Sequence, residues 1–575
     1  MCFDNNKNVD GVVKMKNSAV ESSINASIQS CKVMSKAIKA AQYPQWTIQG
    51  ITFQHNMPIR SVADELVRHY LRTHESTYRI LHIPSFQQEY RQYWTDPQTT
   101  STVSLMKIVL VMAIGTCFSQ SSEFDALKTQ AIQWIHIAQS WLAGPKEKTR
   151  FNTAAVQVEC LLFLARSVWD MGTHITWSHT GNLLRTAMGM GFHRDPKHFK
   201  RFSVLHSEVR RRLWATILEI NIQASLDSGM AAMISPKDFD TEPPSNINDD
   251  EINESVTTHP PVHPSHVFTQ SSMQIELLRS LATRLEVAQF GSNCRIEPSY
   301  EEIIQLDKEL LQLYKGGHSK FARAAQDDSA KFRPTALHRK MFDLKFQGSL
   351  LVLHRPYAME AREHAHFYYS HKIYLDTALA VHSTPPKDLA ATYESMGYEV
   401  EDDYARLCLI GGGSIKEILI QSVIIIYQEM IAPLEEDLPG FFREERRSIR
   451  EPYLHVLREM MHLSYKRLEA GETAVKSHLT YSVAFAHINA LENGTSPEEA
   501  MIEAATLSLS EARAILKRRV PFMPAALGNS FEDGISDMSC GDLDLTMPDW
   551  GMEFEASNSW LFSGWALTNS GDLEF

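Results

Sequence analysis

The hydrophobic positions of this chain follow a helical period over most of its length. From about residue 60 to 235, and again from Met273 to about residue 519, apolar residues recur every three or four positions. This spacing places side chains on one face of an α-helix, whereas the alternation of a half-buried strand is scarce. The pattern predicts an all-α fold of many helices, and a hydrophobic share of 43% is ample for a buried core.

Several helix ends can be read from capping residues. Asn152 is a suitable N-cap for a helix that stops at Gly172, and Ser207 is expected to cap a later helix. Ser496-Pro-Glu-Glu499 combines an N-cap with a proline at the first helical position and a glutamate three residues after the cap. It directly follows Asn493-Gly494, where the preceding helix should stop.

Changes in the pattern divide the chain into four parts. The first is Ser-, Lys- and Asn-rich and expected to be mostly flexible, the second and third form one helical body, and the fourth is an acidic, aromatic tail. These parts are residues 1–55 with a short helix at Met34–Ala41, residues 56–383 with a proline-rich connection at 234–266, residues 384–520 opening on a loop at Thr384–Asp403, and residues 521–575.

No stretch is apolar for long enough to indicate a membrane span. The strongest run, Ile108 to Phe118, is well short of the roughly 20 residues that cross a bilayer, so it predicts a buried helix. Residues 1–25 show neither a signal peptide nor an anchor. We therefore expect a protein that stays inside the cell and does not bind a membrane.

The charge is concentrated at one end. The net charge is -13, and residues 531–575 hold ten Asp or Glu and no Lys, Arg or His, which leaves -3 for residues 1–530. A nucleic-acid-binding surface needs clustered positive charge, and a nearly neutral body does not suggest one.

The seven cysteines are too scattered for a disulfide or zinc framework. No Cys-x-x-Cys pair occurs, so no cysteine-rich zinc site can be assembled locally, and a reducing compartment fits best. The cysteines are Cys2, Cys31, Cys117, Cys160, Cys294, Cys408 and Cys540.

Three other patterns invite a catalytic interpretation, and each lacks a necessary part. Asp249-Asp-Glu251 is similar to the acidic motif of all-helical terpene cyclases, but it lies in the proline-rich connection without a second metal-binding set. The histidine groups at 259–266 and 364–371 lack the paired spacing of zinc hydrolases. Gly411-Gly-Gly413 lacks P-loop spacing and instead indicates a helix break before Ser414. We expect no catalytic residue, metal ligand or cofactor, and keep an all-α metal-dependent enzyme as a remote alternative.

One apolar stripe leaves the oligomeric state open. Its members are spaced by three and four residues, which is more typical of core packing than of a dimer seam, although a homodimer stays possible. They are Leu454, Leu457, Met461, Tyr465 and Leu468.

Four separated segments together resemble the fungal-specific transcription factor domain. They occur in the expected order over about residues 60–360: Leu81-His-Ile-Pro-Ser-Phe86; Gly181 to Pro196 followed by Ser207 to Trp214; Ser225 to Met230 followed by Asp238 to Asp250; and Leu353-His-Arg-Pro-Tyr357. The residues that we single out in this motif are Arg185, His193, Arg194, Asp195, Arg210, Arg211, Arg212 and Trp214.

The resemblance implies an all-α domain that regulates transcription in the nucleus, commonly of a metabolic or secondary-metabolite pathway. Family members normally join this domain to an N-terminal zinc module, but residues 1–60 supply no zinc ligands. DNA contact is thus implied by the family role without a recognisable motif here. A ligand-sensing or dimerisation subunit that acts through a DNA-binding partner is the alternative.

The arginines of the motif predict ion pairing. Arg210, Arg211 and Arg212 point about 100° apart around a helix, so they cannot form one phosphate-facing stripe. We expect at least one to face inward toward a carboxylate such as Asp195 or Asp227. Structural ion pairing is favoured over nucleic-acid contact. The helix that begins near Thr176 should end before Pro196, because proline forbids its continuation.

The tail interleaves large apolar side chains with carboxylates. Such a segment can dock as a short helix into a hydrophobic groove, as an acidic activation segment does on a coactivator. The other interpretation is that the aromatic side chains pack back onto the body. The candidate activation residues are Trp550, Phe554, Trp560, Leu561, Phe562 and Trp565.

Overall fold

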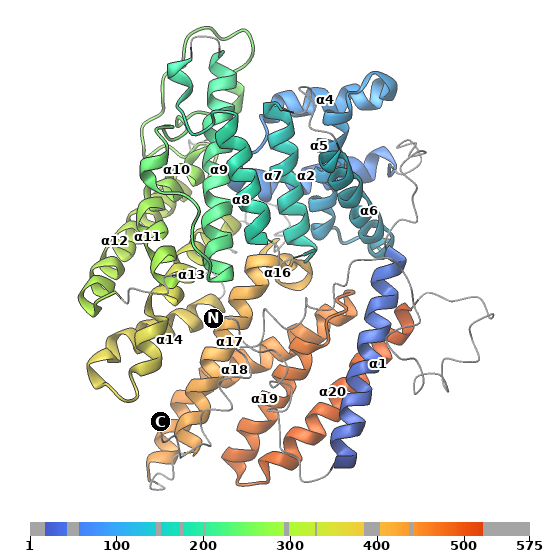
Figure 1. The fold of residues 1–575 in the computed structure, drawn as a ribbon, viewed down its shortest axis with the longest axis vertical. Coiled ribbons are helices and arrows are strands. Elements are labelled where there is room, and N and C mark those ends of the chain that lie inside the picture. The colour runs from blue at the N-terminus through green and yellow to red at the C-terminus, as the bar shows by residue number, and fades with distance from the viewer. Residues whose placement is uncertain are drawn as a thin grey trace, which may run out of the picture. The chain divides into compact units, whose positions relative to one another are not determined.

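The computed structural model describes residues 18–42, 57–144, 151–172, 176–199, 202–292, 298–327, 331–383, 403–435 and 441–520. Within these ranges the chain forms α-helices and short 3-10 turns and no strand, so the all-α prediction is confirmed (Figure 1). The contacts divide the chain into a larger unit, residues 45–426, and a smaller unit, residues 1–44 with 427–575. The boundary lies inside helix α17, later in the chain than the expected division at residue 384.

The larger unit is built of α-helices that pack against one another, with a long irregular connection between α9 and α10 (Figure 1). Its helices are α2 (Arg60–Arg72), α3 (His74–Tyr78), α4 (Ile83–Thr95), α5 (Thr102–Gly115), α6 (Phe124–Ala143), α7 (Thr153–Val168), α8 (Thr176–Gly189), α9 (Val204–Ser228), α10 (Ser272–Arg279), α11 (Leu281–Ser292), α12 (Tyr300–Ala325), α13 (Ala336–Glu360), α14 (Tyr368–Val381), α16 (Asp403–Ile410) and the start of α17 (Gly413–Glu435).

Helix α5 forms the centre of the first half of this unit. It packs against α2, α6 and α7, and every residue from Leu105 to Gly115 is buried. Apart from Lys107, which pairs with Glu89, this stretch is apolar on every side instead of on one face, and the buried helix predicted there is confirmed. Gly115 allows the close approach of α2, because a Cβ at this position would lie 1.9 Å from the backbone oxygen of Leu66.

Most of the predicted helix ends are confirmed. Asn152 caps α7 by accepting a hydrogen bond from the N–H of Ala155 at 2.9 Å. The helix ends at Val168, before the predicted stop at Gly172, which has a φ of +69°. The prediction of Ser207 as the cap of α9 was wrong. The helix begins one turn earlier, where the Ser203 hydroxyl accepts from the N–H of His206 at 3.2 Å.

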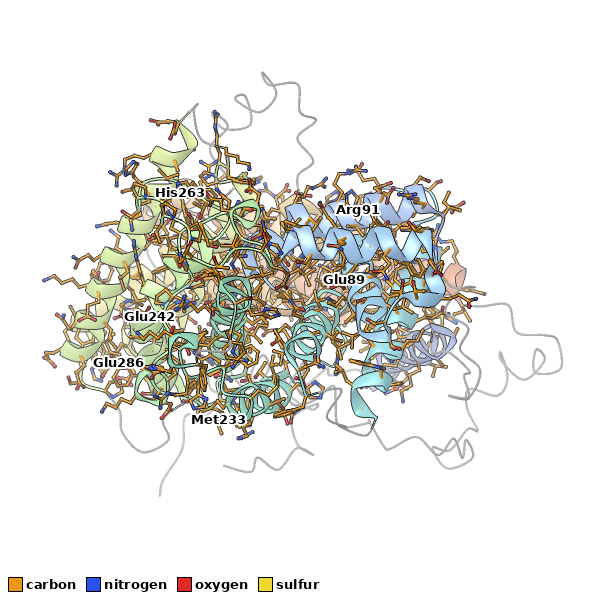
Figure 2. All side chains as sticks on the ribbon, turned by 90° about the horizontal axis from the view of Figure 1, so that it is seen from above. Glu89, Arg91, Met233, Glu242, His263 and Glu286 are labelled. Atoms are coloured by element: carbon orange, nitrogen blue, oxygen red, sulfur yellow. The ribbon has the colours of Figure 1, made fainter. Side chains whose placement is uncertain are left out.

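The proline-rich connection between α9 and α10 is confirmed as irregular. Its described elements are two short 3-10 turns, η7 (Pro236–Asp238) and η8 (Asp249–Glu251). Seen from above in Figure 2, Glu242 and His263 of this connection lie on a different side of the unit from Glu89 and Arg91 of α4. Several polar side chains of the connection nevertheless fix it to its neighbours, for example Asp249 to Arg212 of α9 and Glu242 to Lys197.

The smaller unit contains α1 (Ser18–Gln42), the end of α17, α18 (Phe441–Glu469), α19 (Lys476–Asn493) and α20 (Pro497–Arg519). Helix α1 is longer than the predicted Met34–Ala41, and it packs lengthwise on α20 (Figure 1). Its side of the contact is a cluster of Cys31, Met34 and Ile38 against Leu516. The core interpretation of the α18 stripe agrees with the packing of Leu468 against α20.

Among the described residues, no single helix has the length and apolar character needed to cross a bilayer. Two consecutive helices, Asp403–Ile410 and Gly413–Ala432, meet these criteria only when they are taken together, and they are bent by 80° relative to each other.

Candidate functional site

The short helix α3 carries side chains to two neighbouring features of the larger unit. Glu75 and the adjoining Arg79 enter a network of buried charges, while His74 and Tyr78 line a cavity. Arg79 follows α3 with a φ of +52°, a left-handed conformation that costs about 1 kcal/mol for a residue with a side chain. The surrounding contacts must therefore hold this turn in place.

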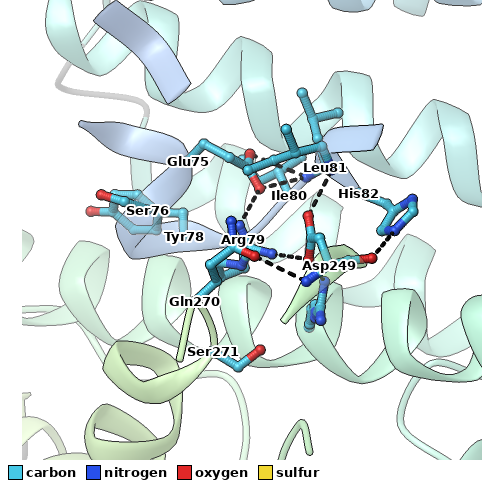
Figure 3. A network of polar contacts seen from close by, with 12 residues as sticks. Glu75, Ser76, Tyr78, Arg79, Ile80, Leu81, His82, Asp249, Gln270 and Ser271 are labelled. Atoms are coloured by element: carbon cyan, nitrogen blue, oxygen red, sulfur yellow. Dashed lines mark hydrogen bonds and ion pairs between the residues drawn. The ribbon is translucent and has the colours of Figure 1, made fainter. Parts of the chain in front are cut away.

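Asp249 of η8 is the centre of the charge network (Figure 3). Its carboxylate accepts hydrogen bonds from the guanidinium groups of Arg79 and Arg212 and, at 2.7 Å, from the N–H of Ile83. His82 meets the backbone oxygen of Asp249 at 2.9 Å. Because Arg79 lies before α4, Arg212 lies in α9 and Asp249 lies in the connection, the network fastens three distant segments together.

The two arginines determine the ionisation of Asp249. Burial alone would raise the pKa of this carboxyl, but Arg79, Arg212 and the N–H of Ile83 hold the pKa far below its usual range. The side chains of both arginines are 1% exposed or less, and that of Asp249 is 3% exposed. Each charge therefore depends on its partner, since no bulk water is available to replace it.

Glu75 behaves in the opposite way. Burial raises the pKa of this carboxyl to about 7, although Arg79 at 3.6 Å and a hydrogen bond from the Tyr70 hydroxyl at 2.7 Å lower it. Its oxygens also accept from the N–H of Leu81 at 3.0 and 3.1 Å. Glu75 is consequently a group that changes charge near neutral pH in the interior of the protein.

A second ion pair joins α9 to the segment after α8. Arg211 binds Asp195 with two parallel hydrogen bonds of 3.0 and 2.9 Å, and it also donates to Glu208 at 2.8 Å. Asp195 further accepts from the N–H groups of Lys197 and Glu242, both at 2.9 Å. Burial would raise the pKa of Asp195, but these donors lower it to about 2. The predicted inward arginine with Asp195 as its partner is thus present.

The other two arginines of the motif also serve the fold. Arg212 pairs with Asp249, and Arg210 stacks its guanidinium on the ring of Phe192 at 4.0 Å while it donates to the backbone oxygen of Met190 at 3.0 Å. Asp227, the other partner that we expected for these arginines, was a wrong choice because its carboxylate bonds to neutral groups near the cavity.

The remaining motif residues lie around these pairs. Trp214 is 1% exposed and packs edge-on against Phe239, and the centre of its ring lies 6.5 Å from that of His193. Arg194 forms an exposed ion pair of 3.0 Å with Asp240. Arg185 is exposed on α8 and belongs to none of the pairs described above. The sequence motif therefore combines buried residues that join neighbouring segments with residues that face solvent.

A cavity of about 70 Å³ lies between α3, α7, α9, α13, α16 and the start of α17. It is large enough for a compact polar molecule or a few waters, since one water needs roughly 10 to 15 Å³ of this kind of volume. Its walls are apolar except for a small set of polar side chains, which are His74, Tyr78, Ser167, Gln223, Asp227, Lys345, Ser414 and Gln421.

The charged groups of the cavity are linked in a chain. Lys345 bonds to Gln223 at 2.8 Å and pairs with Glu219 at 3.3 Å. Gln223 in turn donates to Asp227 at 2.6 Å, and Ser414 donates to the other oxygen of Asp227 at 2.5 Å. Burial raises the pKa of Asp227, and the hydrogen bonds from Ser414 and Gln223 together with the charge of Lys345 only partly oppose that effect. A cationic group placed in the cavity would therefore find a carboxylate without an ion-pair partner among the described residues.

The structure gives no support for a metal centre in the part of the chain that it describes, where no three His, Cys, Asp or Glu side chains converge. In the acidic run 249–251, Asp249 is occupied by arginines, and Glu251 pairs with His263 at 2.7 Å. His259 meets Glu208 at 3.2 Å. These contacts assign the acidic run and two of the histidines to holding the connection.

Known proteins are similar to this chain over most of its length. Residues 67–326 match the fungal specific transcription factor domain. Transcription factor opdR of Penicillium oxalicum is 32% identical over 547 residues, which is 92% of this chain and 68% of that protein. The chain belongs to the fungal specific transcription factor domain family. Transcription factor lepE of Aspergillus flavus is 32% identical over 85% of this chain and 59% of its own length, and the Aspyridones cluster regulator apdR of Emericella nidulans is 30% identical over 74% and 57%. No solved structure matches.

The matched domain contains the charge network and the α3, α7 and α9 walls of the cavity, whereas the remaining lining residues, from Met341 to Gln421, lie beyond the match. The fungal specific transcription factor domain of this chain is thus a set of helices joined by buried ion pairs, and most residues of its sequence motif lie in or near these pairs. Sequence reasoning found Arg210, Arg211 and Arg212 but missed Glu75 and Arg79. The only available signal was the polar pair Glu75 and Arg79 beside the entry motif at Leu81.

The candidate activation residues, Trp550 to Trp565, lie outside the described residues, as does the loop expected at Thr384–Asp403 except for its last residue.

Proposed function

We propose that this chain controls RNA polymerase II transcription of a secondary-metabolite pathway in the nucleus, without enzymatic activity of its own. The observation that carries the proposal is the 30% identity to a protein named as the Aspyridones cluster regulator, across 74% of this chain. The buried pairing of the motif arginines supports it, because these residues stabilise a helical body instead of forming a phosphate-binding surface.

DNA recognition would then depend on a zinc module of the family type or on a DNA-binding partner protein. One relative is named a Zn(2)-C6 fungal-type transcription factor, and this chain covers 45% of its length. Chromatin immunoprecipitation of the full chain in its host should recover promoters of one gene cluster. If the immunoprecipitated DNA is not enriched in the promoters of any gene cluster, the proposal is contradicted.

The tail would supply the activating output. Residues 521–575 fused to a foreign DNA-binding domain should activate a reporter, because carboxylates keep the aromatic side chains in water until they enter a coactivator groove. Changing Trp550, Phe554, Trp560, Leu561, Phe562 and Trp565 to Ala should abolish that activity. The matched control changes six polar tail residues to Ala, namely Ser557, Asn558, Ser559, Ser563, Thr568 and Asn569, and should stay active.

The cavity favours ligand sensing as a second candidate function. Gly348 lies on its α13 wall, where an added Cβ would meet Ile418 at an ordinary contact distance of 3.8 Å. Gly348→Val should therefore fill part of the cavity without a severe clash. If a compact molecule in the cavity controls the protein, this variant should fold but lose induction of the pathway. Gly316→Ala, at an open position in α12, is the control. Normal induction in a folded Gly348→Val variant would remove this candidate.

A further inference from the structure

The smaller unit carries a cationic face on helix α1. Lys32, Lys36 and Lys39 are exposed on α1 and project within an arc of about 60°, given 100° per residue. The face of α1 that packs on α20 contains Cys31, Met34 and Ile38 and lies to one side of this arc. None of the three lysines pairs with a carboxylate among the described residues. Exposed Val33, 48% accessible, lies next to them.

Two further cations approach the same part of α1. Burial lowers the pKa of Lys476, at the start of α19, to about 8, and the charge of Lys32 contributes to this lowering. Arg513 of α20 is close enough to Cys31 to oppose the rise that burial causes in the pKa of that thiol. Arg513 lies near Cys31 on the packed side of α1, whereas Lys476 lies near Lys32. We therefore define the α1 basic face as Lys32, Lys36 and Lys39 with the neighbouring Lys476. This concentration of positive charge would favour an anionic partner.

We propose that the acidic tail of this same chain, residues 531–575, docks on the α1 basic face and covers its own aromatic residues. The tail holds ten carboxylates and no Lys, Arg or His, so its charge is complementary to the face. Its tryptophans can pack on Val33 and on the lysine ammonium groups, since aromatic rings attract cations at close range.

The tail is long enough to reach this face. Eleven residues, 520–530, separate α20 from the first residue of the acidic segment, and they span up to about 35 Å when extended. Helix α1 itself is about 37 Å long, so every lysine of the face is within range of some part of the tail. Covalent attachment gives the tail a millimolar-scale effective concentration at the face, which even a weak interaction can use.

Duplex DNA is a less suitable partner for this face. Phosphate recognition needs a wide basic surface, whereas residues 1–530 carry a net charge of -3. A docked tail would keep its aromatic side chains from a coactivator and so lower transcriptional activation. This regulatory consequence rests on the proposed function, whereas the docking itself does not.

Hydrogen–deuterium exchange of the full chain tests the docking directly. At about 0.05 M salt, tail amides should exchange about tenfold more slowly in the wild type than in Lys32→Glu/Lys36→Glu/Lys39→Glu, and about 0.5 M salt should remove the difference. The matched control is Lys308→Glu/Lys315→Glu/Lys372→Glu, three exposed lysines of the larger unit, which should behave as the wild type. Equal tail exchange in all three proteins, or equal loss of protection in the control, overturns the proposal.

A charge swap guards against a variant that does not fold. Asp549→Lys/Glu553→Lys/Glu555→Lys should lose tail protection, and combining it with the α1 triple variant should restore protection. Failure of this restoration in folded proteins contradicts the docking. Protection of α1 by added duplex DNA, with no change in the tail, would assign the face to nucleic acid instead. The tail-only reporter fusion contains no α1, so its silence refutes activation and leaves the docking result standing.

Discussion

The buried arginines of the larger unit and the α1 lysines of the smaller unit differ in how their charges are balanced. In the larger unit, Arg79, Arg212 and Arg284 are buried completely or almost so, and each pairs with a carboxylate. In the smaller unit, the α1 lysines keep their charges in water without such partners among the described residues. A buried charge needs a fixed partner, so the first arrangement specifies one fold. An exposed unpaired charge contributes little to folding and remains available for binding.

The largest test of this contrast is Asp249→Asn. Removing the carboxylate leaves Arg79 and Arg212 buried without their counter-charge, and the asparagine amide would face the donors of both. The free energy of unfolding should fall by about 3 to 5 kcal/mol, measured by urea denaturation followed by circular dichroism. The control is the neighbouring Asp250→Asn, whose side chain is 57% exposed and pairs with Lys331. This control should cost about 0.5 kcal/mol. Equal losses in the two variants would contradict a structural role for the network.

Glu75→Gln probes the second buried carboxyl through pH. Because the pKa of Glu75 in the folded protein is about 7, above its unfolded value, the folded state holds this proton more tightly. The wild type is therefore stabilised at low pH and loses on the order of 2 to 3 kcal/mol as the pH rises from about 5 to 8. The Glu75→Gln variant should unfold with nearly the wild-type free energy at pH 5 and be more stable than the wild type at pH 8. Parallel curves of stability against pH would show that Glu75 does not titrate in this range.

The helices of both units were predictable because their information is local. Asn152 and Ser496 bind N–H groups within three residues, so their sequence context decides their role. The cap of α9 was misassigned because Ser203 and Ser207 are one turn apart and both acceptable by type. The extent of α1 was underestimated because its packing on α20 joins segments that are more than 450 residues apart in the sequence.

The charge network was only half predictable. The arginine triplet indicates that its members diverge around a helix, and Asp195 was a reasonable partner because it lies 16 residues from Arg211. Nothing local links Arg79 to Asp249, which are 170 residues apart and meet only after α4, α9 and the connection are in place. The cavity is a property of six packed helices and has no sequence pattern of its own.

Gly413→Ala tests how closely α17 must approach the end of α7. Gly413 has a φ of +58°, and an added Cβ would lie 2.1 Å from the Ser167 hydroxyl oxygen. Gly229 has a similar φ of +63° with no atom within 4 Å, so Gly229→Ala measures the backbone strain alone, about 1 kcal/mol. Gly413→Ala should lose about 1 to 3 kcal/mol more in unfolding experiments. Adding Ser167→Ala should recover part of that extra loss, and no difference between the two glycine variants would contradict the close contact.

The smallest expected effect is that of Lys32→Glu, which tests whether the charge of Lys32 repels that of Lys476. Burial and Lys32 hold the folded pKa of Lys476 at about 8, below its unfolded value, so the unfolded chain binds this proton more tightly and stability rises with pH from about 8 to 10. Lys32→Glu should flatten this rise and add about 0.5 kcal/mol to the free energy of unfolding at pH 7. Lys39→Glu makes the same charge change about 10 Å further along α1 and should have a smaller effect. If both variants shift the curve equally, the charge of α1 acts on Lys476 as a whole and not through Lys32.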